Sequence, residues 1–283
     1  SIADTVSSIC EGAFYVCRSL TSITIPEGVT SIGLCAFMGC SSLSSITIPD
    51  SVNYIAYETF YSCSSLTSIT IPSSVTSIGE EAFKGCSSLT SITIGESITR
   101  IGNSAFSSCY ALAEVYNYSN LKVMAGGSGN GYLGYYAKVV YNASDLTGEK
   151  PATRIKDNNG VRYYDDGENT VVALYPLSKD ITTVSLDSRT TEIQLGAFSN
   201  CNNLTSVDFG ENSQLTSIGN SAFSSCYSLT SITILDSVTS IGSGAFQSCR
   251  SLTSVDFGEN SQLTSIGTFA FSGCSSLTSI TIP

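Results

Sequence analysis

Apolar residues recur along this chain in short alternating runs, and the runs themselves repeat. One unit, residues 66–88, reads LTSITIPSSVTSIGEEAFKGCSS. Ile69 and Ile71 alternate with small polar residues, which predicts a strand with one buried and one exposed face. Pro72 has no amide hydrogen and is expected to end the strand.

The apolar side chains in the rest of the unit are expected to point into the same interior. Val75 and Ile78 predict a second short strand whose side chains point inward, and Gly79 predicts a bend. A single unit cannot bury all of these residues, so a stack of coils is required. The segment EEAFKGC then predicts a short helical turn with an inward side that carries Ala82, Phe83 and Cys86.

The unit recurs in two stretches of the chain. Its leucines lie 23 residues apart at Leu20, Leu43, Leu66, Leu89 and Leu112. Its phenylalanines follow at Phe14, Phe37, Phe60, Phe83 and Phe106, and again at Phe198, Phe223, Phe246 and Phe271. The later spacing alternates between 25 and 23 because Gly210–Leu215 and Gly258–Leu263 each carry two extra residues. This regularity predicts a solenoid.

The phrase LTSITIPSSVTSIGEEAFKGC resembles the BspA-type leucine-rich repeat, and the likeness covers about residues 1–124 and 181–283. The resemblance implies an α/β fold: a right-handed leucine-rich repeat solenoid of about ten coils of 23–25 residues, with a parallel sheet on its concave face. It also implies an extracellular or cell-surface protein that acts in adhesion or host contact.

The repeat is interrupted, which divides one continuous solenoid into an N-terminal arm (1–124), a Tyr-rich insert (125–180) and a C-terminal arm (181–283). Within the insert, residues 132–142 fit either a helix or a strand. Residues 153–176 predict a β-meander, because NNG and DDG supply turns between extended runs. The acidic DDGEN lacks the ligand order of a calcium loop, so a hairpin turn is the favoured interpretation.

Composition excludes several functions. The chain has no histidine, which removes Ser-His-Asp catalysis and His-ligated metals, and no nucleophile–base pair or phosphate loop is evident. We therefore expect no enzyme and no cofactor. The net charge of −11 argues against nucleic acid and anionic membranes as partners. No apolar run is long enough for membrane insertion.

Nine of the eleven cysteines follow the repeat phenylalanine by three residues. A metal ladder or a disulfide scaffold would be the functional interpretation. A column of small buried side chains is favoured, because stacked coils supply one ligand per layer where zinc needs four around one point. Cys10 and Cys35 lie outside this column, and a disulfide between them is a hypothesis.

A leucine-rich solenoid usually binds through the exposed side chains of its concave strands, and aromatic and arginine residues usually anchor partners. We place the candidate surface on the insert and the neighbouring coils. The alternative is that the tyrosines of the insert form a small core of their own. The candidates are Ser68, Thr70, Ser91, Thr93, Tyr132, Tyr135, Tyr136, Arg154, Arg162, Tyr163, Tyr164, Ser206, Asp208 and Asp256.

Three functions fit these observations. The first is adhesion, by binding a protein or glycan on a host or neighbouring cell. The second is an architectural spacer or surface-layer element, and the third is an ice- or crystal-binding array of Ser-x-Thr columns. Both ends lack polar caps, so the chain is expected to be a fragment of a longer protein. Its terminal coils could then associate end to end.

Overall fold

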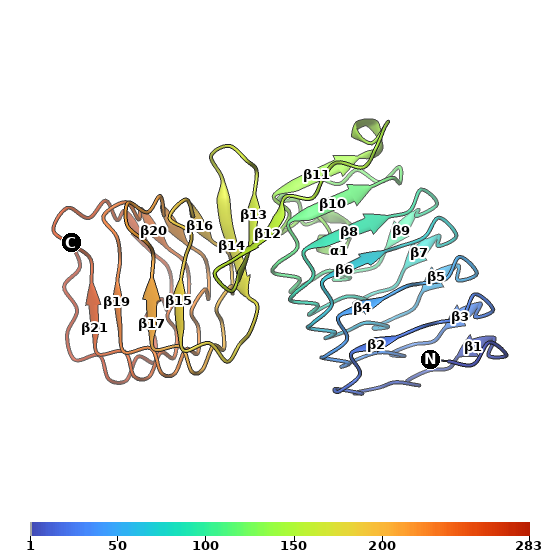
Figure 1. The fold of residues 1–283 in the computed structure, drawn as a ribbon, viewed down its shortest axis with the longest axis horizontal. Coiled ribbons are helices and arrows are strands. Elements are labelled where there is room, and N and C mark those ends of the chain that lie inside the picture. The colour runs from blue at the N-terminus through green and yellow to red at the C-terminus, as the bar shows by residue number, and fades with distance from the viewer. Residues whose placement is uncertain (1) are drawn as a thin grey trace. The chain divides into compact units, whose positions relative to one another are not determined.

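The computed structural model describes residues 2–283 and forms two compact units, Ser1–Thr153 and Arg154–Pro283 (Figure 1). Each unit has its own hydrophobic core, one built from residues between 9 and 137 and the other from residues between 161 and 274. The boundary falls inside the predicted insert, so the insert is divided between the units. About eleven coils are present in total.

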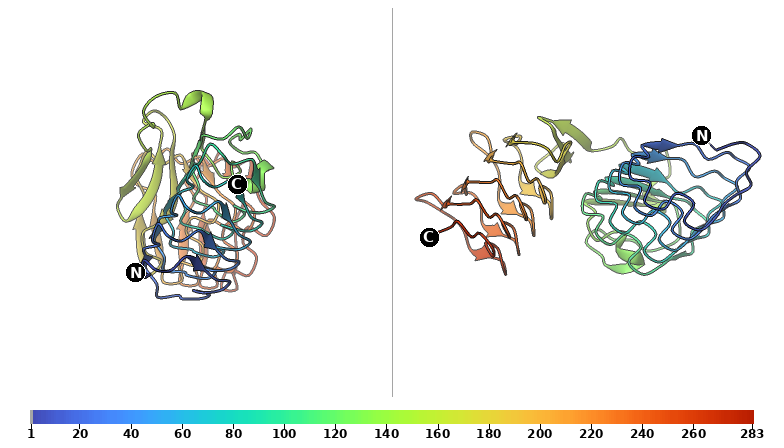
Figure 2. Two further views of the ribbon diagram at one scale, coloured as in Figure 1. Left: turned by 90° about the vertical axis from the view of Figure 1, so that its right-hand side faces the viewer. Right: turned by 90° about the horizontal axis from the view of Figure 1, so that it is seen from below.

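Each coil of the first unit contributes two short strands, and the coils stack one behind the next (Figure 2). The first set pairs in parallel and consists of β2 (Ser22–Ile23), β4 (Ser45–Ile46), β6 (Ser68–Thr70), β8 (Ser91–Ile94) and β10 (Glu114–Asn117). The second set consists of β1 (Ser8–Ile9), β3 (Ser31–Ile32), β5 (Tyr54–Ile55), β7 (Ser77–Ile78) and β9 (Arg100–Ile101). Both predicted strands of the repeat are therefore present.

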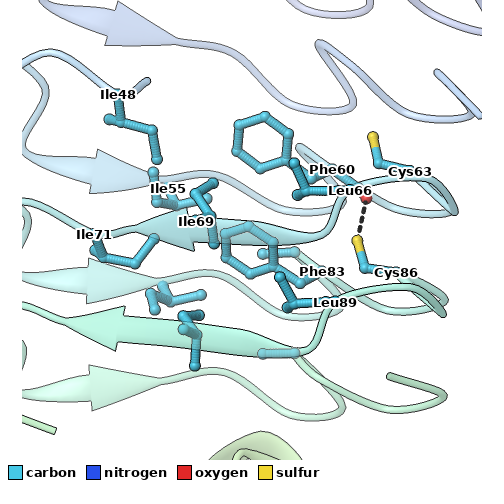
Figure 3. Close-up of a cluster of buried hydrophobic side chains, with 14 of the residues drawn as sticks. Ile48, Ile55, Phe60, Cys63, Leu66, Ile69, Ile71, Phe83, Cys86 and Leu89 are labelled. Atoms are coloured by element: carbon cyan, nitrogen blue, oxygen red, sulfur yellow. Dashed lines mark hydrogen bonds between the residues drawn. The ribbon is translucent and has the colours of Figure 1, made fainter. Parts of the chain in front are cut away.

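The core is a set of columns in which like residues lie on like (Figure 3). Phe83 is fully buried, and its ring stacks on Phe60 and on Phe106 with centroids 5.2 Å apart in each case. Full burial of such a side chain stabilises the fold by about 1.5–3 kcal/mol. A coil thus depends on its neighbours for most of its core contacts.

The predicted helical turn at EEAFKGC is wrong, because the segment folds as successive turns. Glu81 and Gly85 adopt left-handed backbone conformations with φ of 54° and 77°. Amides then alternate in direction: Lys84 donates to the Glu81 carbonyl within the coil, whereas Phe83 donates to the Ala105 carbonyl of the next coil. The alternation lets every second amide of the segment join the next coil, a pattern that the i to i−4 bonds of an α-helix do not produce.

The role predicted for Gly79 also changes. Its φ is not in the left-handed region, so it supplies no special bend. A Cβ at this position would lie 2.7 Å from the carbonyl carbon of Ala56 in the preceding coil. Glycine is needed here because two backbones approach closely.

The second unit repeats the two-strand coil and carries the predicted β-meander. Its first strand set is β15 (Thr183–Ser185), β17 (Ser206–Asp208), β19 (Ser231–Thr233) and β21 (Ser254–Asp256). Its second set is β16 (Glu192–Ile193), β18 (Ser217–Ile218), β20 (Ser240–Ile241) and β22 (Ser265–Ile266). The meander of β12 (Ile155–Asn158), β13 (Val161–Asp165) and β14 (Val171–Pro176) extends this second set, with β14 parallel to β16.

The first part of the insert belongs to the first unit. The strand β11 (Val139–Asn142) pairs in parallel with β10 and adds a final strand to that sheet. It is followed by a 3-10 turn, η1 (Ala143–Asp145). The element α1 (Gly129–Tyr132) is one irregular turn, since Asn130 and Gly131 are left-handed. Within residues 132–142, the strand occupies Val139–Asn142 and the residues before it form no regular helix.

Candidate binding surfaces

The predicted serine and threonine columns form a groove in the first unit. Ser68 lies opposite Ser91 and Thr70 opposite Thr93 in the parallel register, and the pattern continues back to β2. The groove has a volume of about 590 Å³. We call it the Ser/Thr groove; it is lined by Ser22, Ile23, Thr24, Ser45, Ile46, Thr47, Ile48, Asp50, Ser68, Ile69, Thr70 and Pro72.

The groove presents many weak hydrogen-bonding groups and one charge. Each Ser or Thr hydroxyl can donate and accept, and strand repetition spaces them by about 4.8 Å. Asp50 supplies the only carboxylate of the lining residues. This arrangement suits an extended partner that makes repeated contacts.

At β10 the small hydroxyl residues of these columns are replaced by larger side chains. A later segment of the same chain covers them. Glu114 and Tyr116 take the places of Ser91 and Thr93, and both are buried. The Lys150 ammonium lies 3.9 Å from the centre of the Tyr116 ring and donates to the Thr93 hydroxyl at 3.2 Å. Desolvation lowers the pKa of Lys150, although Glu114 opposes this effect. Ser91 and Thr93 thus lie half-buried where the open surface ends.

Thr153 completes this cover. Its hydroxyl donates to the Glu114 carboxylate at 2.8 Å, and the Tyr116 hydroxyl donates to the same oxygen at 3.1 Å. A buried carboxylate requires such donors because it has lost its water. The stretch around residues 150–153 is therefore fixed to the sheet face.

The predicted candidates Ser206, Asp208 and Asp256 are exposed on the first strand set of the second unit. Asp208 accepts hydrogen bonds from the Ser185 hydroxyl at 3.0 Å and from the Gly210 amide at 2.9 Å. Asp256 accepts from the Gly258 amide at 3.0 Å. Both carboxylates therefore brace the turns that begin the two-residue insertions. Ser206 precedes Asp208 on β17 and is also exposed.

Two insert tyrosines predicted as binding residues are buried. The Tyr163 hydroxyl accepts from the Asp187 amide at 3.1 Å, and the Tyr164 hydroxyl accepts from Arg154 at 3.1 Å. Burial raises the pKa of Tyr163, and the amide hydrogen bond partly offsets this. Tyr164 therefore bonds within the meander, whereas Tyr163 packs in the core that the meander shares with the coils of the second unit and joins it to Asp187.

Arg162 is likewise occupied within the meander. Its guanidinium makes two hydrogen bonds to the Asp157 carboxylate, at 2.6 and 2.8 Å, and donates to the Tyr175 hydroxyl at 2.8 Å. The hydrogen bond from Arg162 lowers the pKa of Asp157. This bidentate pair joins β12 to β13 and β14.

Tyr132 and Tyr135 are exposed and pack edge-to-face, with ring centres 5.5 Å apart. Tyr136 is half-buried, and its hydroxyl accepts a hydrogen bond from the Ser108 amide at 3.2 Å. In the preceding coil the equivalent amide, that of Gly85, donates to the carbonyl of Ser107 in the coil that follows. The Tyr136 hydroxyl therefore replaces a backbone carbonyl and caps the last regular turn. Burial raises its pKa to about 12.

A lysine caps the first regular coil of the second unit. The Lys179 ammonium donates to the carbonyls of Ala197 and Ser199, at 3.4 and 2.9 Å. In other coils these carbonyls accept amides of the preceding coil, as Ala105 accepts from Phe83. Sequence reasoning missed both caps, because each replaces a backbone group that only the stacked structure reveals.

The cysteine column is packed as predicted. Eight of its nine members are buried, and Cys17 is exposed. Seven of the eight buried thiols also donate hydrogen bonds to phenylalanine carbonyls, for example from Cys86 to the Phe60 carbonyl at 3.2 Å. Burial raises the pKa of Cys226 to about 12. Cys10 and Cys35 are free thiols, and Cys35 donates to Glu58 at 3.4 Å.

A second, smaller groove was not predicted. It has a volume of about 270 Å³ and lies over β5, β7 and β9. The signal in the sequence was a set of departures from the repeat, where large or charged residues replace small polar ones. We call it the Tyr54–Arg100 groove; its lining includes Leu34, Tyr54, Tyr57, Ser77, Glu80, Arg100 and Asn103.

The stacked two-strand coils and their leucine, isoleucine and phenylalanine columns define a leucine-rich repeat protein. The chain belongs to the BspA-type leucine-rich repeat family, since a family model described as "BspA type Leucine rich repeat region (6 copies)" matches residues 1–126 and 174–283. No catalytic family is indicated. Across residues 2–283, no helix has the length and apolar character needed to span a bilayer.

Two similar solved structures are leucine-rich repeat proteins from other bacteria. A leucine-rich cell surface protein from Faecalibacterium prausnitzii is 27% identical, with 97% of this chain and 76% of that chain covered and a TM-score of 0.45. A leucine-rich repeat protein from Bacteroides ovatus is 30% identical, with 96% and 81% covered and a TM-score of 0.40. Among curated protein sequences, none matches this chain.

Proposed function

We propose that this protein is displayed at the cell surface and binds an extracellular protein or glycan through the Ser/Thr groove. The observation that carries the proposal is the groove itself, whose in-register hydroxyls stay open over β2, β4 and β6. The chain's own residues cover the next part of the same face. The family and a similar protein described as a cell surface protein support the location.

The exposed Tyr132 and Tyr135 are a secondary part of this proposal, as aromatic side chains often anchor partners. Tyr136, Tyr163, Tyr164, Arg154 and Arg162 are assigned to packing instead, because their polar atoms are bonded within the units. The proposed contact surface is therefore narrower than the whole insert.

The test displays the full chain against extracellular-matrix proteins and a glycan array. Thr47→Arg places a large side chain in the groove and is expected to reduce binding at least tenfold. Thr233→Arg changes an exposed threonine at the same position of a coil in the second unit, and serves as the matched control. Equal loss in both variants would contradict a role for the groove, and no binding to any surface would favour the architectural spacer.

A further inference from the structure

The Tyr54–Arg100 groove concentrates departures from the repeat at one place. Tyr54, Ser77 and Arg100 lie in register on three adjacent strands. With adjacent strands about 4.8 Å apart, the Cα atoms of Tyr54 and Arg100 are separated by about 10 Å. The small Ser77 between them leaves a notch with an aromatic wall and a cationic wall.

The equivalent positions of the second unit have no such notch. The strand column that corresponds to Tyr54, Ser77 and Arg100 reads Glu192, Ser217, Ser240 and Ser265. It contains no aromatic ring and no cation. The repeat therefore tolerates small residues at these positions, and the fold itself does not require the large ones.

The walls of the groove are accessible. Leu34, Tyr54 and Tyr57 are 44%, 41% and 43% exposed, although they are large apolar side chains. A cluster of such residues on a surface marks an interaction site, whereas scattered ones do not.

Arg100 is the one cation among the residues that line the groove, and Glu80 is the one carboxylate. It is exposed, and among the described residues it has no ion-pair partner. Guanidinium groups pair with carboxylates through two parallel hydrogen bonds. An unpaired arginine beside tyrosine rings thus fits a ligand that has both a carboxylate and an apolar face.

The size of the groove limits the ligand. Its volume of about 270 Å³ lies just below the range of roughly 300–1,000 Å³ that is typical of ligand pockets. It accommodates one or two sugar rings and is too small for a helix or a folded domain. Asn103 and Glu80 line the groove and can hydrogen-bond sugar hydroxyls.

We propose that the Tyr54–Arg100 groove binds a carbohydrate that carries a carboxylate, such as a uronic acid. The sugar ring lies over Ser77 against Tyr54, and its carboxylate pairs with Arg100. This site is separate from the Ser/Thr groove and does not depend on the ligand proposed there.

The test titrates the full chain with methyl β-D-glucuronide and follows backbone amides by NMR. Single-sugar affinity is expected in the millimolar range, and methyl β-D-glucoside is expected to bind at least tenfold more weakly because it lacks the carboxylate. Arg100→Ser should abolish the preference between the two sugars, and Tyr54→Ser should weaken glucuronide binding at least tenfold. Both variants introduce the serine that the repeat uses at this position, so folding should be retained.

Tyr15→Ser removes an exposed tyrosine outside the groove and should leave the titration unchanged. N-acetylglutamate amide tests whether any carboxylate suffices. The proposal is overturned if that compound binds as tightly as glucuronide, if the two sugars bind equally, if Arg100→Ser has no effect, or if glucuronide causes no shifts in the groove.

Discussion

At the scale of single residues, seven of the eight buried cysteines act as hydrogen-bond donors as well as packing groups. Each thiol of the type seen at Cys226 donates to the carbonyl of a repeat phenylalanine, here Phe198 at 3.2 Å. Burial disfavours the thiolate, so the pKa of Cys226 rises from 9.0 to about 12. The unfolded chain therefore releases this proton at a lower pH than the folded chain.

This difference predicts a pH dependence of stability. The contribution of the Cys226 thiol is complete below pH 9 and is lost as the pH rises from 9 toward 12. Between pH 9 and 12, the free energy of unfolding of Cys226→Ala should fall less steeply with pH than that of the unsubstituted protein. The difference between the two slopes should be about 1.4 kcal/mol per pH unit. Urea unfolding followed through second-unit amides measures this. Cys10→Ala, at an exposed position, is the control, and equal slopes in all three proteins would contradict the prediction.

A second residue-scale prediction concerns the close approach at Gly79. Gly79→Ala places a Cβ 2.7 Å from the Ala56 backbone, where no flexible side chain can yield. We expect the first unit to lose about 1–3 kcal/mol of stability, as overpacked cores do. Gly148→Ala is the matched control, since a Cβ there meets nothing within 4 Å. Chemical denaturation compares the two, and equal stability of both variants would contradict the close-approach role.

At the scale of elements, the strands were predictable and the turns were not. Alternation of Ile69 and Ile71 with serine and threonine suffices to place β6 and its buried face. The turn at Glu81 depends on a left-handed residue that is not glycine. Its conformation is favourable only when the next coil accepts the amides, so a local pattern cannot reveal it.

Some candidate sites were likewise predictable from the sequence, and others were not. The Ser/Thr columns followed from strand alternation, because exposed positions of stacked strands must align. The groove at Tyr54 and Arg100 was missed because the two residues are far apart in sequence and only the register of β5, β7 and β9 brings them together. The sequence could not show which insert tyrosines bind a partner, because an aromatic side chain is equally suited to a binding surface and to a hydrophobic core.

Tyr136 provides the element-scale prediction. Tyr136→Phe keeps the ring but removes the acceptor of the Ser108 amide. We expect faster hydrogen exchange at Ser108 and a loss of about 0.5–1.5 kcal/mol, the contribution of one hydrogen bond, because this bond is only partly buried. Tyr135→Phe removes a hydroxyl from an exposed neighbouring ring and is the control. It should change neither the hydrogen exchange at Ser108 nor the stability. Unchanged exchange at Ser108 in Tyr136→Phe would show that the hydroxyl is not a cap.

At the scale of the whole molecule, the interruption of the repeat divides the hydrophobic core in two, although the same repeat pattern builds both parts. The first unit ends its sheet with β11 and its turns with Tyr136. The second begins with β14 beside β16 and with Lys179 on the open carbonyls. Among the described residues, no strand pair joins the two units. Solenoid coils are stabilised by their neighbours, so cooperativity is expected to stop where the stack stops.

The intact chain should therefore unfold in two transitions that respond to different substitutions. Phe83 and Phe223 occupy the same place in the two stacks, and each ring is fully buried between two others. Truncation to alanine at either site should cost about 3–5 kcal/mol. Calorimetry is expected to show that Phe83→Ala lowers the melting temperature of one transition and Phe223→Ala that of the other. A single transition, lowered alike by both variants, would show instead that the units unfold together, because a cooperative stack distributes the loss over all its coils.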